Sequence, residues 1–247
     1  MTGRSQLSSI VLCVSVLASM AGGCASTTTA TSDPSQNDPY ESFNRQMFEF
    51  NDRLDRNVAL PVAKAYVKVV PEPARDGLHN ILDNLNTPVT LANDILQGEP
   101  KHAIQSLGRI VVNSIIGIGG LVDVATPMGI PAHEEDFGIT LALWGVDEGP
   151  YLVLPLLGPS NPRDAGGRAV DIAFDPLTYW GFTGKVYYTT GRQLASIVDE
   201  RSRNIDTMDE LRRSSVDLYA TLRSLYRQHR NSEIRGGKPD LQNLPNI

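Results

Sequence analysis

The chain has 247 residues, of which 41% are hydrophobic and 20% are charged, and its formal net charge is −6. This length fits one sizeable domain with tails, and the acidic balance argues against a nucleic-acid partner, because binding phosphates requires a basic surface. Both cysteines, Cys13 and Cys24, lie near the start of the chain, so the rest of it can form no disulfide and no cysteine metal site.

Residues 1–23 have the layout of a signal peptide. A short positive end with Arg4 precedes an apolar run over residues 10–20, which is too short to span a membrane stably, and small residues follow. The sequence AGGC at residues 21–24 resembles a bacterial lipobox, in which Cys24 is lipidated and becomes the mature N-terminus. An ordinary signal peptide with a chance cysteine is the alternative.

Residues 24–37 are rich in Ser and Thr, which is typical of a flexible tether. By resemblance to other lipoproteins, Ala25 in the second mature position, rather than Asp, favours export to the outer membrane. We therefore expect a lipid-anchored chain on the periplasmic side of the outer membrane.

The ordered part is expected to begin with a helix over residues 38–54. One apolar stripe recurs there at spacings of three and four residues, and we expect most of its side chains to face a core. Phe48 lies off this stripe, and Pro61 should end or kink the helix. The stripe consists of Tyr40, Phe43, Met47, Phe50 and Leu54.

Residues 60–117 are predicted to form short helices arranged as helical hairpins. The residue before a proline avoids helical backbone, so each proline is expected to separate two helices. These prolines are Pro71, Pro73, Pro88 and Pro100. Side chains that favour caps and turns lie between them. They are Asn84, Asn86, Thr87 and Asn93.

Two apolar segments follow, and both are too interrupted to supply a membrane span of about 20 residues. Residues 110–132 carry few charges besides Asp123, and the glycines within 117–120 predict a turn that folds the chain back on itself. A hairpin buried in a core is the plain alternative. Residues 139–158 are broken by glycines, prolines and two adjacent acids.

Apolar residues recur along 192–231 as one long amphipathic helix, with Arg and acidic residues alternating on its other face. The tail at 232–247 contains Gly, Pro and Asn without periodicity and is expected to be disordered. Residues 38–231 should therefore form one all-α domain, built from helices broken by proline and glycine.

No motif supports an enzyme. The sequence HEED at 133–136 offers an imidazole and three carboxylates, but ligands in consecutive positions point in different directions, so a solvated loop is favoured over a zinc site. A hydrolase would require a cleft that gathers His133 with carboxylates. The triplet DFG at 136–138 stands without the other kinase motifs. We predict no catalytic, cofactor-binding or metal-binding residue.

Five motifs follow one another over roughly residues 38–190. They read DPYESFNRQMFEFN, NLNTPVTLANDILQG, VVNSIIGIGGLVDVA, DFGITLALWGVDEGPYLVLPLLGPSNPRD and DIAFDP. In this order they resemble the MlaA (VacJ) family of outer-membrane lipoproteins. The resemblance implies an all-α, ring-like protein lying in the inner leaflet of the outer membrane. It also implies that the protein removes misplaced phospholipid from the outer leaflet through an amphipathic channel to a periplasmic carrier, MlaC, with trimeric porins as partners.

The resemblance further suggests which residues form a channel or the hairpin beside it. We expect the N-terminal helix to gate the channel, and polar residues within the apolar segment either to satisfy backbone groups or to contact a lipid headgroup. These residues are Phe43, Asn44, Asn113, Ser114, Gly117, Gly119, Gly120 and Asp123. A structural adaptor that binds porins without any conduit is the alternative, and a continuous cavity would distinguish the two.

Overall fold

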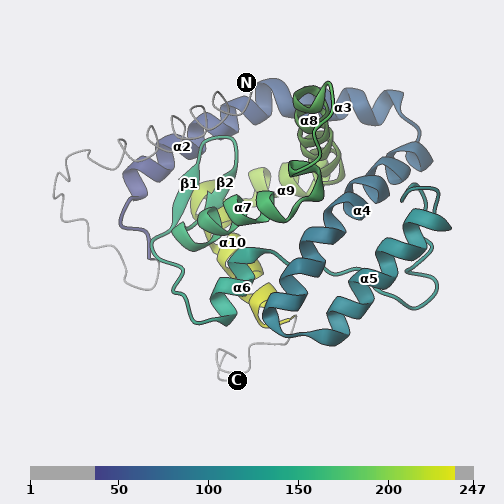
Figure 1. Ribbon diagram of the computed structural model, residues 1–247. Coiled ribbons are helices and arrows are strands. Elements are labelled where there is room, and N and C mark those ends of the chain that lie inside the picture. The colour runs from purple at the N-terminus through teal and green to yellow at the C-terminus, as the bar shows by residue number, and fades with distance from the viewer. Residues whose placement is uncertain (1–36, 237–247) are drawn as a thin grey trace, which may run out of the picture. The chain divides into compact units, whose positions relative to one another are not determined.

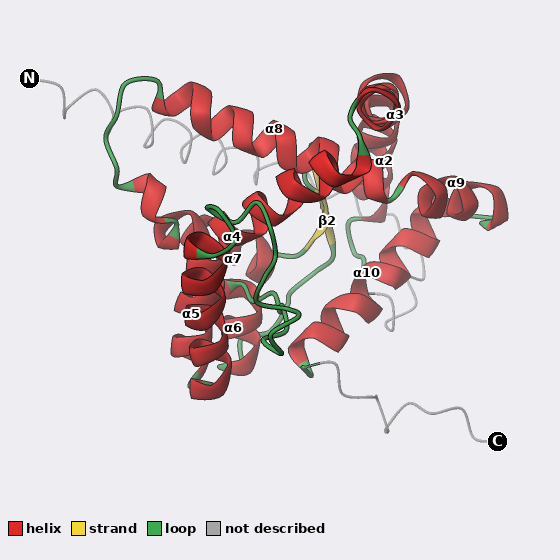
Figure 2. Cartoon of the chain, turned by 90° about the vertical axis from the view of Figure 1, so that its right-hand side faces the viewer, coloured by secondary structure: helices red, strands yellow, loops and turns green. Residues whose placement is uncertain are grey.

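The computed structural model describes residues 37–236 (Figure 1). The predictions for the signal peptide, for Cys24, for the tether up to residue 36 and for the tail from residue 237 lie outside the described residues. The start of the tail, up to Ile234, continues the last helix instead of being disordered. Within residues 37–236 the architecture is helical apart from one antiparallel pair of short strands, which confirms the all-α class (Figure 2). The elements are α2 (Glu41–Leu54), η3 (Asp55–Ala59), α3 (Leu60–Val69), α4 (Glu72–Gln97), α5 (Pro100–Ile115), α6 (Phe137–Leu143), β1 (Leu152–Leu154), β2 (Gly158–Ser160), α7 (Pro162–Phe174), η4 (Pro176–Thr178), α8 (Lys185–Arg203), α9 (Ile205–Ser214) and α10 (Leu218–Ile234).

Prolines interrupt the helices less than predicted. Pro61 lies in the first turn of α3, and the chain stays helical from α2 through the π-helical turn η3 into α3. A proline removes one helical hydrogen bond and crowds the preceding turn, and the wider π-helical turn before Pro61 accommodates both effects. Pro71 and Pro73 do separate α3 from α4, and Pro100 separates α4 from α5, as predicted. Pro73 and Pro100 lie in the first turns of their helices, where the missing amide hydrogen would have no partner.

The prediction of a break at Pro88 is wrong, because α4 is 26 residues long and continues through this proline. The four expected cap and turn residues between 84 and 93 also lie inside this helix. Asn93 instead donates a hydrogen bond to Asp171 Oδ1 at 3.0 Å, across to α7. Contacts with α5, α6, α7 and α8 surround α4, so tertiary packing overrides the local preference of these residues.

The strand pair lies within the segment 139–158 and just after it, where no strand is predicted, and α2 runs along β1. The side-chain amide of Asn44 donates to Tyr151 O and accepts from Val153 N, both at 2.9 Å. Asn51, two helical turns later, does the same with Leu154 O and Leu156 N. These two amides therefore satisfy the free edge of β1 as a third strand would.

The C-terminal segment forms three helices rather than one long helix, with breaks at Asn204 and before Asp217, which caps α10. Arg230 on α10 donates to both carboxylate oxygens of Asp136 at 2.7 Å and to Asp164 Oδ2 at 2.9 Å. This arginine joins α10 to the start of α6 and to α7. Gly138 has no room for a side chain there, since a Cβ would lie 2.5 Å from Arg230 Nη2.

Buried polar side chains outnumber buried apolar ones in the described residues. The apolar cluster consists of Tyr151, Val153 and Tyr219, with Met47, Phe48 and Tyr226 packed against it. Phe48, off the stripe of α2, contacts Tyr219 with ring centroids 5.7 Å apart. The stripe itself is mostly exposed, and Phe43 is 50% exposed, so the prediction that most of the stripe faces a core is wrong.

Candidate functional site: a polar cavity in a helical unit with an apolar surface

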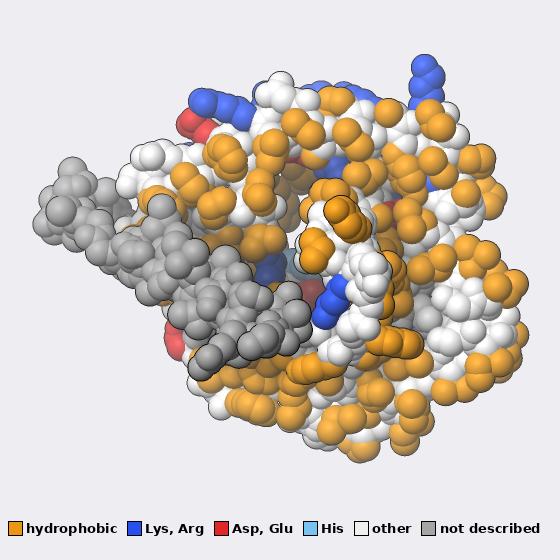
Figure 3. Space-filling view, turned by 45° about the horizontal axis from the view of Figure 1, so that its top comes forward, with side chains coloured by type: hydrophobic (Ala, Val, Ile, Leu, Met, Phe, Trp, Pro, Cys, Tyr) orange, Lys and Arg blue, Asp and Glu red, His pale blue; other side chains and the backbone are white. Residues whose placement is uncertain are grey.

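A cavity of about 870 Å³ lies between α4, α7, η4 and α8. Its volume is within the range of about 300–1,000 Å³ that is usual for small-molecule sites. In Figure 3 the molecule is hollowed near the middle of the face shown, with charged side chains inside the hollow and hydrophobic ones around it. The polar residues of its wall are His79, Asp83, Asn86, Glu134, Arg168, Asp171, Asp175, Thr178, Lys185, Thr189, Arg192, Gln193, Ser196, Asp199, Glu200, Arg203 and Asn204.

Helix α8 has one polar face and one apolar face, and the polar face lines the cavity. Polar residues recur along it at steps of three and four, as one helical stripe requires. They are Lys185, Thr189, Arg192, Ser196 and Asp199. The apolar residues exposed outside this stripe are Val186, Tyr187, Tyr188, Leu194 and Ile197. The helix therefore separates an apolar exterior from a polar interior.

Several charged groups of the cavity wall are paired with one another. Arg192 forms an ion pair with Asp175 at 2.5 Å. The carboxylate of Asp199 lies 2.8 Å from His79 Nδ1 and 3.1 Å from Arg203 Nε. These pairs fix the side chains of α4, α7 and α8 against one another. They also leave few of these charges available for a ligand.

Arg168 and Lys185 are the exceptions among the basic residues of the wall. Neither forms an ion pair with a carboxylate of residues 37–236, and Lys185 donates only to the carbonyl oxygen of Thr178, at 2.5 Å. Arg168 is exposed on α7 and Lys185 begins α8, so the two cations stand on different walls. An anionic group that enters the cavity would meet these two first, because their charges are not neutralised.

The carboxyl of Asp171 shows that a negative charge is costly at this part of the cavity wall. Burial raises the pKa of this carboxyl above its ordinary value, against the lowering effect of hydrogen bonds from Asn93 and from the Phe137 amide at 3.0 Å. A buried carboxylate is costly because it loses hydration. The inner part of the cavity is therefore less favourable to a further negative charge than the positions near Arg168 and Lys185.

The outer surface is apolar to an unusual extent for a protein in water. On α5, Ile104, Leu107, Val111 and Ile115 lie on one helical face, and Ile104 and Ile115 are 71% and 75% exposed. The turns after α5 expose further side chains of this kind, including Ile118. Across residues 37–236, no helix combines the length and the hydropathy that crossing a bilayer would require.

The opposite face of α5 is polar and buried, and it holds the turns that follow. The Asn113 side chain accepts hydrogen bonds from Val124 N and Ala125 N, both at 2.9 Å, and donates to Asp123. Arg109 donates to Thr126 Oγ1, to Ile130 O and to Asp123 Oδ2 at 2.8–3.1 Å. Burial alone would raise the pKa of Asp123, but hydrogen bonds from Thr126, Arg109 and Asn113 lower this pKa to about 2.

Six of the eight residues predicted for a channel or hairpin lie in this turn region. The chain reverses at 116–120, as predicted, and then runs as irregular turns rather than as a second helix. Gly120 has φ 93° and sits against Asn84, which donates to Ser114 Oγ at 3.1 Å. At Gly117 a Cβ would lie 2.2 Å from Val122 O, so the reversal requires glycine there.

The other two predicted residues, Phe43 and Asn44, have separate roles on α2. Asn44 is fully buried and binds β1, whereas Phe43 is exposed. None of the eight residues lines the cavity, and their role in transport stays a prediction. Arg168, Lys185 and the polar stripe of α8 were not predicted from the sequence. The spacing of the stripe is visible in the sequence, but the convergence of α4, α7 and α8 around the cavity is not.

The HEED sequence is only partly a solvated loop. Asp136 caps α6 and pairs with Arg230, and Glu135 accepts from Gln97 at 2.9 Å. His133 turns toward Asp94 on α4, with a side chain 19% exposed. The four residues do point in different directions, as predicted, but three of them are bound into the structure.

These features define a class of helical protein that exposes many hydrocarbon side chains and encloses a polar cavity. The family model described as MlaA lipoprotein matches residues 36–233, and the chain belongs to this family. The "Intermembrane phospholipid transport system lipoprotein MlaA" of Escherichia coli K12 is 37% identical over 228 residues, which are 91% of this chain and 88% of that protein.

A second relative and a solved structure agree with this assignment. The protein of the same description from Haemophilus influenzae is 35% identical over 220 residues, covering 87% of this chain and 86% of that protein. A solved structure described as "Structural basis for maintenance of bacterial outer membrane lipid asymmetry" superposes with a TM-score of 0.71 at 35% identity. The superposition covers 80% of this chain and 98% of the solved chain.

Proposed function

We propose that this protein removes misplaced phospholipid from the outer leaflet of the outer membrane and passes it through the cavity to a periplasmic carrier. The observation that carries the proposal is the polar cavity within a unit whose exterior is apolar. The names of the relatives support phospholipid transport as the process. No bond of the lipid is made or broken.

The physical task is to move a charged headgroup past hydrocarbon. Without a polar path, burying a phosphate in an apolar medium costs many kcal/mol, because the charge loses its hydration. The polar faces of α4, α7 and α8 replace part of that hydration, while the acyl chains stay in contact with apolar surface. Such a path lowers the barrier but supplies no energy, so the direction must come from an acceptor with higher affinity for the lipid.

Arg168 and Lys185 are proposed to receive the phosphate. Both are cationic, both line the cavity, and neither is neutralised by a carboxylate of the described chain. A guanidinium binds phosphate oxygens with two hydrogen bonds, and an ammonium binds them as a point charge. Because the other basic residues of the wall are paired, these two would contribute most of the attraction.

The apolar face of α5 and the turns after it are proposed to lie in the inner leaflet, with a lipid on Cys24 as a second anchor. Helices that lie in one leaflet need an apolar face but not the length of a span. Trimeric porins are proposed as neighbours in the same membrane. A porin-bound adaptor without a conduit is the alternative function, and it makes no use of the charges inside the cavity.

The test replaces both cavity cations by acids, in Arg168→Glu/Lys185→Glu, in a strain that lacks the wild-type gene. We expect phospholipid at the cell surface, labelled with a membrane-impermeant amine reagent, to stay as high as in the deletion strain. A matched double reversal outside the cavity, Lys64→Glu/Lys68→Glu, should restore the low surface phospholipid of the wild type. Equal protein levels by immunoblot are required. Full rescue by the cavity variant would contradict transport through the cavity and favour the adaptor.

A further inference from the structure

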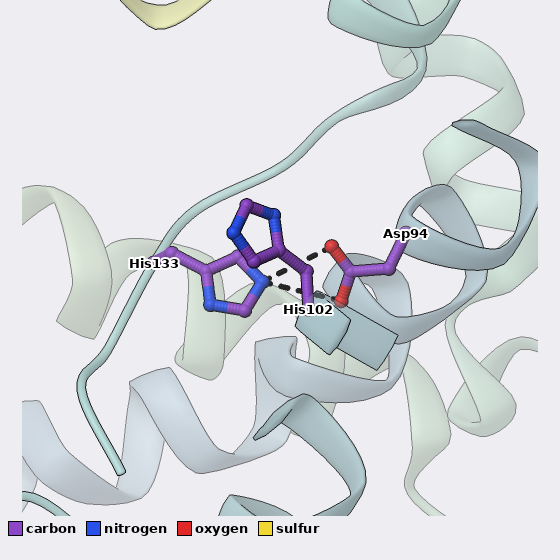
Figure 4. A group of neighbouring side chains, drawn as sticks. All are labelled: Asp94, His102 and His133. Atoms are coloured by element: carbon purple, nitrogen blue, oxygen red, sulfur yellow. Dashed lines mark hydrogen bonds and ion pairs between the residues drawn. The ribbon is translucent and has the colours of Figure 1, made fainter. Parts of the chain in front are cut away.

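Three side chains that can bind a metal meet beside the C-terminal end of α4. Asp94 comes from α4, His102 from the first turn of α5, and His133 from the connection that leads to α6. One donor atom from each of the three lies within 4.8 Å of the others (Figure 4). Asp94 and His102 lie on two consecutive helices, and the fold brings His133, from further along the chain, beside them.

The carboxylate of Asp94 is fully buried, which makes its charge costly. It accepts a hydrogen bond from Ser106 Oγ at 2.6 Å, and its two oxygens lie 3.0 and 3.2 Å from His133 Nε2. Among the described residues, its side-chain partners are therefore one hydroxyl and one imidazole. Buried carboxylates are normally paired with a charge or coordinate a metal ion.

The distance between Asp94 and His133 suits two ligands that share one ion, and His102 lies within 4.8 Å of both. Zinc bonds of about 2.0–2.1 Å to nitrogen and oxygen place two tetrahedral ligands about 3.3 Å apart. The separation of 3.0–3.2 Å between Asp94 and His133 is close to this value. The two imidazole rings lie beside each other, with centroids 4.8 Å apart and planes inclined by 38°.

The surroundings resemble those of a metal site as well. Ligating carboxylates are usually held by an outer hydrogen-bond donor, and Ser106 on α5 holds Asp94 in this way. Two imidazoles with one carboxylate favour a transition metal over Mg²⁺ or Ca²⁺, which prefer oxygen ligands. Three protein ligands leave a fourth position for water.

We propose that Asp94, His102 and His133 form a binding site for a divalent transition-metal ion of the zinc class. The ion would join the helical pair α4–α5 to the connection that carries the turns after α5. Glu134, in the cavity wall, directly follows His133. The site would therefore fix one edge of the cavity. It stands apart from the lipid path, and neither proposal depends on the other.

The test uses the full chain, purified in detergent without a polyhistidine tag and stripped with EDTA. Titration with Co²⁺ should give one equivalent bound, with the intense d–d absorption of a low-coordinate site. Zn²⁺ should displace it and raise the melting temperature, since a ligand that binds only the native state stabilises it. His102→Gln and His133→Gln should each weaken binding by at least about tenfold.

The His102→Gln variant guards against misfolding, because it leaves the contact between Asp94 and His133 in place. Far-UV circular dichroism should match the wild type. His229→Gln is the matched control, since His229 is exposed on α10 and lies outside the cluster. The proposal is overturned if the stripped wild type binds no Co²⁺ and melts at the same temperature with Zn²⁺ or EDTA, or if both cluster variants bind Co²⁺ as the wild type does.

Discussion

Around the β1–β2 hairpin the rings of Tyr151 and Tyr219 are buried with Val153, alongside polar side chains such as Asn44. On α5 every buried side chain is polar, and these are Ser106, Arg109 and Asn113. The first region packs as a protein in water does, with apolar rings inside. The second region reverses this order and exposes its apolar side chains. On the proposal that α5 lies in the inner leaflet, the difference follows from two surroundings: near the hairpin the hydrophobic effect favours burial of rings, but beside hydrocarbon it offers no gain.

What holds the second region together must then be hydrogen bonding. Asn113, Arg109 and Asp123 satisfy one another and the backbone of the turns after α5. In surroundings of low dielectric such a network is strong when complete and costly when one member is removed. Substitutions in the two regions should therefore obey opposite rules.

The largest expected effect is in the apolar cluster. Tyr219→Ala removes a ring that packs against Phe48 and Tyr151, and its hydroxyl donates to Asp38. Loss of a buried ring costs about 3–5 kcal/mol of unfolding free energy. Urea unfolding in detergent measures it. Tyr187→Ala is the control, because Tyr187 is 86% exposed, and its effect should stay within about 0.5 kcal/mol. Equal losses for both would remove the distinction between the two positions.

The next largest effect sharpens the contrast between the two regions, because a more hydrophobic side chain on the buried face of α5 should destabilise the protein. Asn113→Leu keeps similar volume but leaves the amides of Val124 and Ala125 without their acceptor. Buried unsatisfied groups cost about 1–3 kcal/mol each, so we expect a loss of about 2–4 kcal/mol. Ser114→Ala, next to it and exposed, should cost less than about 1 kcal/mol. Stabilisation by Asn113→Leu in the same urea assay would mean that this region follows the rules of an ordinary core.

The third effect is acid sensitivity. Hydrogen bonds hold the pKa of Asp123 at about 2, below the ordinary 3.8. A carboxyl whose pKa is lowered by folding stabilises the protein above its unfolded pKa, and this contribution is lost as the pH falls toward the folded value. We expect about 2 kcal/mol to disappear between about pH 4 and pH 2. Asp123→Asn should flatten the curve of unfolding free energy in this window, and parallel curves for the two proteins would refute the assignment.

The sequence predicted which residues share a helical face better than it predicted what that face touches. The stripe of α2 has the expected spacing, yet Tyr40, Phe43 and Phe50 are exposed while Phe48, off the stripe, reaches the core. Periodicity reports that two sides of a helix differ. It does not report whether water, protein or lipid lies on the apolar side, because a hydrocarbon side chain suits both of the last two.

Prolines and glycines were a similarly incomplete guide to where helices end. Pro88 breaks a helix in isolation, but the buried residues Val89, Thr90 and Asn93 tie this stretch of α4 into the fold. The glycine reversal at 117–120 was predictable, since its geometry is local. The cavity and the cluster around Asp94 were not, because each gathers residues from helices that only the tertiary fold places together.

The smallest expected effect on folding comes from the apolar face of α5, and it tests the solvent directly. Ile104→Ser/Ile115→Ser changes two exposed side chains, so the unfolding free energy in detergent should move by no more than about 0.5 kcal/mol per site. Flotation with phospholipid vesicles, in a Cys24→Ala background so that no acyl anchor contributes, should nevertheless fall at least about tenfold, because each buried isoleucine is worth about 1.5–3 kcal/mol.

Val216→Ser provides the matched control, since Val216 is fully exposed between α9 and α10. If α5 is the face that meets lipid, this change should leave flotation as it is. Unchanged flotation of the α5 variant would mean that its apolar face meets another protein, and the inverted packing of Asn113 and Arg109 would then reflect a protein partner rather than a membrane. An equal fall in both variants would mean that any exposed apolar side chain contributes, and that α5 has no special place in binding.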